Sequence, residues 1–261
     1  KASCLVKYAI SNVSDSKITG TFWGVNVIYP GKKPKSLKIY YPYGIYNNNF
    51  SKGGIRQRTV LNYIPGKNPA DPNNIVNEPV SSWAAVLDQN GVGAIVDVDF
   101  ARLDRFYSFL SLVDMFQVST VEWFSRRLVL KPLAEGIKDA ANRPELDDPL
   151  HDYIYKTSCS YMPIAGFPEV SAFYNGIAVG IEAKGKNAVV SLCADRALGS
   201  STLQLQVTGP DQKLYSPAQV SKLNLQPGRT IQVKLAVPGL NIRDKLLLVK
   251  IMQDSGASLA S

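Results

Sequence analysis

The sequence predicts an all-β protein in which two antiparallel β-sandwich domains follow one another along the chain. Three observations support this fold class. Apolar and polar residues alternate with a period of two through most of the chain. Turn-forming Gly, Pro and Asn residues separate these runs, and a single segment has the composition of a helix. With 261 residues, 45% of them hydrophobic, the chain is long enough for two ordinary domains.

The first domain is expected to occupy residues 1–132. Its expected strands are Leu5–Ile10, Ile18–Tyr29, Ser36–Tyr41, Trp83–Leu87, Val92–Val98, Val118–Phe124 and Leu128–Leu130. Asn90-Gly91 separates two apolar runs and therefore predicts a hairpin. Periodicity leaves Phe106–Phe116 open between a strand and one short helix. Residues 42–80 hold five prolines and an Asn-rich run, which predicts one long loop.

Residues 133–152 are expected to form a linker with a short helix. Ala134–Asn142 is the convincing helix former of the chain, and Arg143-Pro144 predicts its end. The following stretch, Glu145–Pro149, is acidic and turn-like. Such a composition is typical of a domain boundary, so we expect the second domain at residues 153–261.

The second domain is expected to be a smaller sandwich of short strands. These are Val170–Tyr174, Ile177–Ala183, Asn187–Ala194, Thr202–Thr208, Leu214–Tyr215, Ser221–Leu225, Thr230–Val237 and Lys245–Met252. Turn signals such as Asn175-Gly176 and Gln226-Pro227-Gly228 separate them. About seven short strands with turns every 8–12 residues are typical of an immunoglobulin-like or fibronectin-like sandwich. The second half of the chain has no Cys…Trp…Cys pattern, which excludes an antibody-type domain there.

Two groups of strings in the first half resemble galactose-mutarotase-like super-sandwich proteins. They are Tyr8-Ala9-Ile10-Ser11-Asn12 with Ile18–Trp23, and Thr120–Phe124 with Leu128-Val129-Leu130-Lys131-Pro132. In that superfamily a Y-x-I-x-N strand belongs to a large antiparallel sandwich and an L-x-L-x-P strand ends it. The resemblance covers residues 5–132 and implies that this chain holds only part of a super-sandwich. Mutarotase-type catalysis uses two histidines and a carboxylate, but His151 lies outside the matched strings, so no catalytic residue is carried over.

The positive charge of the chain is concentrated at its N-terminal end. The formal net charge is +8, from 29 Lys and Arg against 21 Asp and Glu. Residues 1–75 hold eleven of these basic side chains and two of the acidic ones, whereas the rest of the chain is nearly neutral. Such a segment favours an anionic partner, for example an acidic polysaccharide, a nucleic acid or a charged surface. A solvated lysine-rich face is the alternative interpretation.

Basic and aromatic residues are interleaved from Trp23 to Arg58, and this mixture predicts a carbohydrate-binding surface. Aromatic rings stack on sugars, and lysines pair with uronate, sulfate or phosphate groups. The candidate contacts in this segment are Trp23, Lys32, Lys33, Lys35, Lys38, Tyr40, Tyr41, Tyr43, Tyr46, Arg56 and Arg58. Alternatively, the tyrosines pack the sandwich with their hydroxyls at its rim. No motif here specifies nucleic acid.

Glu122 and Arg126 are the remaining candidate ligand contacts. Together with Arg127 they flank Trp123 in the sequence, which could form a carbohydrate-contacting cluster. An ion pair at the edge of a sheet is the alternative interpretation of the same residues.

The sequence contains no recognisable catalytic or metal-binding motif. It lacks a nucleophile elbow, a phosphate-binding loop and a zinc-protease motif, and we expect no cofactor and no metal. Asp97 and Asp99 lie two residues apart on an expected strand, where they could act as paired carboxylates or mark its wet face. Cys159 and Cys193 could form a disulfide, or the three cysteines, with Cys4, could be buried thiols.

These observations favour a non-catalytic extracellular or cell-surface protein that binds carbohydrate, with acidic polysaccharide as the preferred ligand. No apolar run is long enough for a transmembrane helix. The first residue is Lys1, so we expect a processed form or a piece of a longer protein. Two alternatives stay open. One is a self-associating structural subunit of a surface layer or filament. The other is a carbohydrate-active epimerase or lyase, or a fragment of one, that uses Tyr, Arg or carboxylate groups instead of histidine and would lose turnover on replacement of Glu122 or Asp97.

Overall fold

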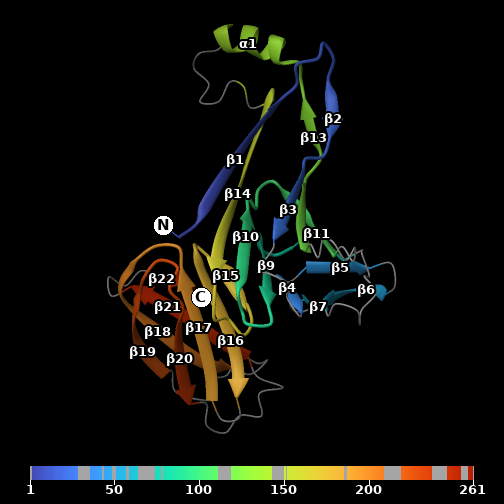
Figure 1. Cartoon of the computed structure of the whole chain (residues 1–261). Coiled ribbons are helices and arrows are strands. Elements are labelled where there is room, and N and C mark those ends of the chain that lie inside the picture. The colour runs from blue at the N-terminus through green and yellow to red at the C-terminus, as the bar shows by residue number, and fades with distance from the viewer. Residues whose placement is uncertain are drawn as a thin grey trace.

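The computed structural model describes residues 2–28, 36–42, 44–48, 51–56, 59–63, 74–77, 79–110, 119–142, 150, 152–184, 187–208, 219–236, 246–253 and 258–260. These residues form several antiparallel sheets and one short helix, which confirms the all-β class (Figure 1). In this part of the chain, no helix has the length and hydrophobicity needed to span a bilayer.

Two six-stranded antiparallel sheets share the first core. One has the order β1 (Cys4–Ser11), β14 (Ile154–Ile164), β10 (Gly93–Val98), β9 (Trp83–Asp88), β4 (Leu37–Tyr41) and β7 (Thr59–Tyr63). The other has the order β3 (Trp23–Ile28), β12 (Ser119–Ser125), β11 (Leu103–Leu110), β8 (Asn74–Asn77), β5 (Gly44–Asn48) and β6 (Ser51–Arg56). Ile39, Val86 and Val96 of the first sheet pack with Phe106 and Trp123 of the second, and all five are fully buried. The period-two alternation therefore produces a sandwich.

Residues 42–80 do not form one long loop, so this prediction was wrong. β5 and β6 pair with each other, β7 pairs with β4, and β8 lies between β5 and β11. Pro42 and Pro79 lie just outside β4 and β8, where the missing N–H removes no ladder hydrogen bond. These two prolines therefore lie next to strands, whereas Pro65, Pro69 and Pro72 lie outside the described residues.

Two four-stranded sheets form a second sandwich. Their orders are β15 (Ala172–Tyr174), β16 (Ile177–Lys184), β17 (Asn187–Ala194), β20 (Ile231–Ala236), and β19 (Gln219–Leu225), β18 (Leu198–Thr208), β21 (Leu246–Gln253), β22 (Ser258–Ala260). Ile177 and Leu192 of the first sheet pack with Leu203 and Ile251 of the second. The predicted Asn175-Gly176 turn connects β15 to β16, and both residues have positive φ, 49° and 74°. Strand Leu214–Tyr215 lies outside the described residues.

β14 belongs to the first sandwich, although it follows the expected linker. Its residues 154–161 pair with β1, and its residues 159–164 pair with β10. No strand was expected at Ile154–Ile164. A third cluster of buried residues then joins the two sandwiches, with Trp83 and Leu87 of β9 in contact with residues that include Met162 and Phe167. β9 is consequently buried on both faces.

An arm projects from the first sandwich (Figure 1). It contains the far parts of β1 and β14, the two-stranded sheet of β2 (Ile18–Gly20) and β13 (Leu128–Leu130), and α1 (Leu133–Asn142) at its end. The helix confirms the prediction for Ala134–Asn142. Gly136 allows α1 to lie directly on Tyr153, because a Cβ atom at this position would be 2.4 Å from the Tyr153 ring. The structure therefore places the predicted linker helix at the tip of an arm.

Two open points of the sequence analysis are settled by the fold. Leu103–Leu110 is a strand, so the first part of Phe106–Phe116 is not helical, and residues 111–118 lie outside the described part.

The Cys159–Cys193 bridge is not formed. Cys159 lies in the core of the first sandwich and Cys193 in the cluster between the sandwiches, both as free buried thiols, whereas Cys4 is exposed.

Candidate anion-binding site

A pocket lined by three arginines lies where the arm leaves the first sandwich. Its volume is about 410 Å³. The lining residues are Ala101, Arg102, Arg126, Arg127, Leu128, Val129, Leu130, Asp152 and Tyr155. They come from the turn before β11, from the connection between β12 and β13, from β13 itself, from the start of β14, and from Asp152, which lies two residues before β14. We call this feature the arginine pocket.

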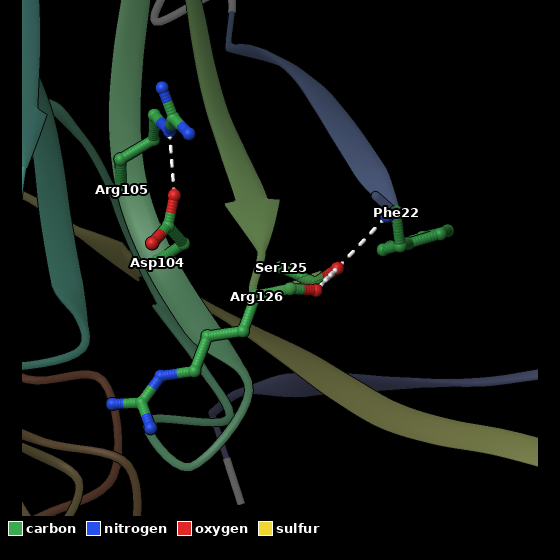
Figure 2. A network of polar contacts seen from close by, with 5 residues as sticks. All are labelled: Phe22, Asp104, Arg105, Ser125 and Arg126. Atoms are coloured by element: carbon green, nitrogen blue, oxygen red, sulfur yellow. Dashed lines mark hydrogen bonds and ion pairs between the residues drawn. The ribbon is translucent and has the colours of Figure 1, made fainter. Parts of the chain in front are cut away.

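Backbone hydrogen bonds fix the position of the arginines. The Arg126 N–H donates to the Arg102 carbonyl oxygen at 3.0 Å, which ties the two arginine-bearing segments together. The Ser125 hydroxyl donates to the Arg126 carbonyl oxygen at 2.8 Å and accepts from the Phe22 N–H at 2.9 Å (Figure 2). The residue before Arg126 is therefore held by the neighbouring strand, and the arginines extend from a fixed backbone.

In the described part of the lining, three arginines face a single carboxylate. Asp152 is the carboxylate in the lining, and it forms an ion pair with Lys131 at 3.0 Å. The Arg102 guanidinium lies 5.5 Å from the centre of the Tyr155 ring, in cation–π geometry. Within the described residues, no carboxylate pairs with Arg102, Arg126 or Arg127. Such a group of cations favours a carboxylate, sulfate or phosphate ligand.

Tyr155 forms the buried wall of the arginine pocket. It is 5% exposed, and burial raises the pKa of its hydroxyl. The hydroxyl lies close to those of Thr157 and Ser125 but makes no hydrogen bond of standard geometry within the described part of the chain. Because the hydroxyl is buried, Tyr155 supports the Arg102 guanidinium and does not present its hydroxyl to a ligand.

A β-bulge places a second ion pair beside the pocket. The pairing of β11 with β12 shifts between Leu103 and Arg105, so Asp104 is the extra residue. Asp104 accepts from the Arg105 Nε–H at 2.7 Å (Figure 2). In Figure 2 the guanidinium groups of Arg105 and Arg126 point away from each other. Arg126 also lines a neighbouring pocket of about 370 Å³ with Asp104 and Phe100, so its side chain separates two hollows.

Trp23 and Glu122, both predicted as ligand contacts, are joined in the structure. The Trp23 Nε1–H donates to the Glu122 carboxylate at 2.7 Å, and the Trp23 ring stacks on Phe124 with 5.6 Å between centroids. Trp23 is 56% exposed, whereas Glu122 is 4% exposed and also accepts from the Thr120 hydroxyl. Trp23 is therefore a fixed, accessible aromatic ring. Glu122 is bound to Trp23 and Thr120, and the expected cluster of Glu122 around Trp123 does not form, because Trp123 faces the core.

Tyr40 and Tyr41 are not ligand contacts, which corrects that prediction. Tyr40 is 1% exposed in the cluster between the sandwiches, and Tyr41 is fully buried in the first core against Phe106. Successive residues of β4 point to opposite faces, and both faces of this strand are covered. The alternative interpretation of packing tyrosines describes both residues.

The other predicted contacts are only partly placed. Lys38 is half-buried in β4. Tyr46 lies in β5 and Arg56 in β6, but their side chains are not described. The predicted contacts outside the described residues are Lys32, Lys33, Lys35, Tyr43 and Arg58. His151 also lies outside them.

Arg102 and Tyr155 were missed by the sequence analysis. No local signal marks them, because Arg102 meets Arg126 only through the pairing of β11 with β12, and Tyr155 lies on a strand that was not expected.

Asp97 and Asp99 are close in sequence but bind different partners. Asp97 accepts from the Ser82 hydroxyl at 2.6 Å, and burial raises the pKa of its carboxyl. Asp99 accepts from the Ala101 N–H in a turn. Across the described ranges, no group of three potential metal ligands is present.

Comparison with known proteins does not assign a family. No family model and no curated protein matches the sequence. Among solved structures, a crystal structure of a DUF4785 family protein from Legionella pneumophila is similar, with 8% sequence identity and a TM-score of 0.28. That comparison covers 99% of this chain and 91% of the other. At this level of similarity it carries no argument about function.

Proposed function

We propose that this protein binds acidic carbohydrate at the arginine pocket, as a non-catalytic extracellular or cell-surface protein. The observation that carries the proposal is that three arginines line one pocket and that none of them forms an ion pair with a carboxylate among the described residues. Guanidinium groups bind carboxylate and sulfate in bidentate fashion, and the buried Tyr155 ring supports the Arg102 guanidinium. The exposed ring of Trp23, fixed by Glu122 and Phe124, is available for stacking on a sugar.

The first test is retention of the purified chain on immobilised polymers. A polyuronate, a sulfated glucan and a neutral glucan are compared at low and high salt. We expect retention on the two acidic polymers and release by salt, because exposed charges are screened. Analysis of the eluted polymer for shortened or modified products tests the enzymatic alternative in the same experiment.

A pair of matched variants tests the arginine pocket itself. Arg126→Gln removes one pocket guanidinium and should weaken binding to the acidic polymers by about tenfold, the size of one charge-assisted hydrogen bond. Arg229→Gln removes the same charge from an exposed position beyond β19 and should bind like the parent chain. Equal weakening in both variants would show that net charge, and not the pocket, retains the polymer.

The finer fold assignments belong to the same proposal. We propose that the two six-stranded sheets are part of a galactose-mutarotase-like super-sandwich and that the two four-stranded sheets are immunoglobulin-like. The number of strands and the antiparallel pairing support both assignments. The proposed domains 1–132 and 153–261 then share β14, which follows the linker and completes a sheet of the first domain.

A further inference from the structure

β3 is the terminal strand of its six-stranded sheet, and its backbone pairing identifies which groups face outward. β12 lies on one side of β3, and within the described residues no strand pairs with the other side. The Ser125 N–H donates to the Phe22 carbonyl at 2.9 Å, so the backbone groups of Phe22 face β12. Backbone groups alternate along an antiparallel strand. Those of Trp23, Val25 and Val27 therefore face the free edge.

The same residues carry the exposed side chains. Trp23, Val25 and Val27 are 56%, 50% and 62% exposed. The strand Trp23–Ile28 contains no charged residue and no proline. Proteins usually protect a free edge with lysine, proline or a bulge, and β3 has none of these devices. An unprotected apolar edge is typical of a strand that is paired in the functional assembly.

We propose that β3 pairs with β3 of a second copy of this chain, around a two-fold axis at Val25. This register gives three hydrogen-bonded residue pairs, each formed by residues whose backbone groups face outward. Val25 lies opposite Val25 of the second copy, and Trp23 lies opposite its Val27. Pairs of an aromatic and a β-branched residue are favourable across antiparallel strands.

The uncharged strand argues for a second copy as the occupant. The axis at Val25 places this residue opposite its own equivalent, so a charged residue there would face a like charge. Its absence makes β3 self-complementary. The pairing closes on itself, because each copy uses the edge of its single β3, and it joins the two six-stranded sheets into one continuous sheet. The proposed pairing uses no residue of the arginine pocket, but it places Trp23, whose ring is also available for stacking on a sugar, beside Val27 of the second copy.

The association is measured by sedimentation over a range of protein and salt concentrations. We expect a dimer whose population rises with salt, because each chain carries a net charge of +8 and salt screens the repulsion. Salt weakens polymer binding, so the two proposals predict opposite responses. Val25→Lys should abolish the dimer, and Val80→Lys, at an exposed valine outside the strands, should leave it intact.

The register is tested by cysteine cross-linking in a Cys4→Ser background. In the proposed pairing the two Cα atoms at position 25 are about 5.5 Å apart, within the range of a disulfide. Val25→Cys should therefore oxidise to a covalent dimer. Position 27 faces Trp23 of the other copy, and its own equivalent lies more than about 13 Å away. Val27→Cys, although more exposed, should not cross-link.

Two results overturn the proposal. One is a parent chain that sediments as a monomer at every concentration and salt level. The other is a Val27→Cys variant that cross-links as fast as Val25→Cys, since random collision, and not the two-fold register, would then form the bond. A dimer that forms without any retention on acidic polymers would support the pairing of β3 and contradict the function proposed for the arginine pocket.

Discussion

At the scale of single residues, neutral donors stabilise a buried carboxylate on an otherwise open face of a sheet. Glu122 accepts hydrogen bonds from the Trp23 indole and the Thr120 hydroxyl. Glu122 therefore fixes the exposed ring of Trp23. Because Glu122 is bound to Trp23 and Thr120, it does not form an ion pair with Arg126. The consequence is that the arginine keeps its capacity to bind an anion from solution.

The buried thiol of Cys159 predicts a loss of stability in alkali. Burial raises its pKa from the ordinary value of 9.0 to about 11. The neutral thiol is favoured in the folded state, so this stabilisation is complete below pH 9 and is lost as pH rises to about 11. Two pKa units correspond to about 2.7 kcal/mol.

The measurement is the free energy of unfolding in urea between pH 8 and 11, compared between variants. The parent chain should lose more stability than Cys159→Ala over this range, because the variant has no thiol to ionise. Cys4→Ala, which removes the exposed thiol, should follow the parent chain. Parallel curves for the parent and Cys159→Ala would contradict the prediction.

At the scale of elements, the arm depends on strands that continue from the sandwich. β2 and β13 pair with each other just beyond the place where β3 and β12 pair. Two glycines in this ribbon have different surroundings. A Cβ atom at Gly24 would lie 2.3 Å from the buried Trp123 Nε1, whereas at Gly20 nothing lies within 4 Å. The contact with the core therefore ends between β3 and β2.

This difference predicts unequal effects of the same substitution. Gly24→Ala should lower the free energy of unfolding by about 1–3 kcal/mol, because Trp123 is fully buried and has to move. Gly20→Ala should change it by less than about 0.5 kcal/mol. Urea denaturation of both variants measures the difference, and equal midpoints would show that Trp123 can shift without loss.

The strands with clear alternation, the helix Ala134–Asn142 and the Asn-Gly turns could be predicted because their signals are local. β14 could not, since both β1 and β10 cover its sides and polar and apolar residues mix along it. Tyr40 and Tyr41 are adjacent residues of the same type, and the sequence gives no sign that both are buried. The structure shows that each belongs to a different buried cluster. The arginine pocket could be predicted only in part. Arg126 and Arg127 are neighbours in the sequence, but Arg102 comes close to them only through strand pairing.

At the scale of the whole molecule, the cluster between the sandwiches couples their stabilities. Phe167 is fully buried there, and its N–H donates to the carbonyl of Gly91 in the β9–β10 hairpin. Its ring also lies against Gly180 of β16. Phe167 therefore contacts elements of both sandwiches, through its backbone and its ring, and the two sandwiches should unfold together.

Cooperativity can be followed with two probes. The three tryptophans, Trp23, Trp83 and Trp123, lie in the first half, so their fluorescence reports the first sandwich, whereas circular dichroism reports both. The two urea transitions should coincide in the parent chain. Phe167→Ala should lower the free energy of unfolding by about 3–5 kcal/mol and should separate the two transitions. Phe100→Ala, at an exposed position, should leave the free energy of unfolding unchanged and the two transitions coincident. Separate transitions in the parent chain would contradict the coupling.

Asn12, at the base of the turn that precedes β2, begins an Asn-Val-Ser glycosylation sequon. It is 1% exposed, and its amide group donates to the carbonyls of Ser16 and Leu130 and accepts from Ser14. No nitrogen is left to carry a glycan once the arm is folded. If the chain passes through a secretory pathway, folding of the arm and glycan transfer to Asn12 exclude each other, and the folded protein carries an unmodified asparagine there.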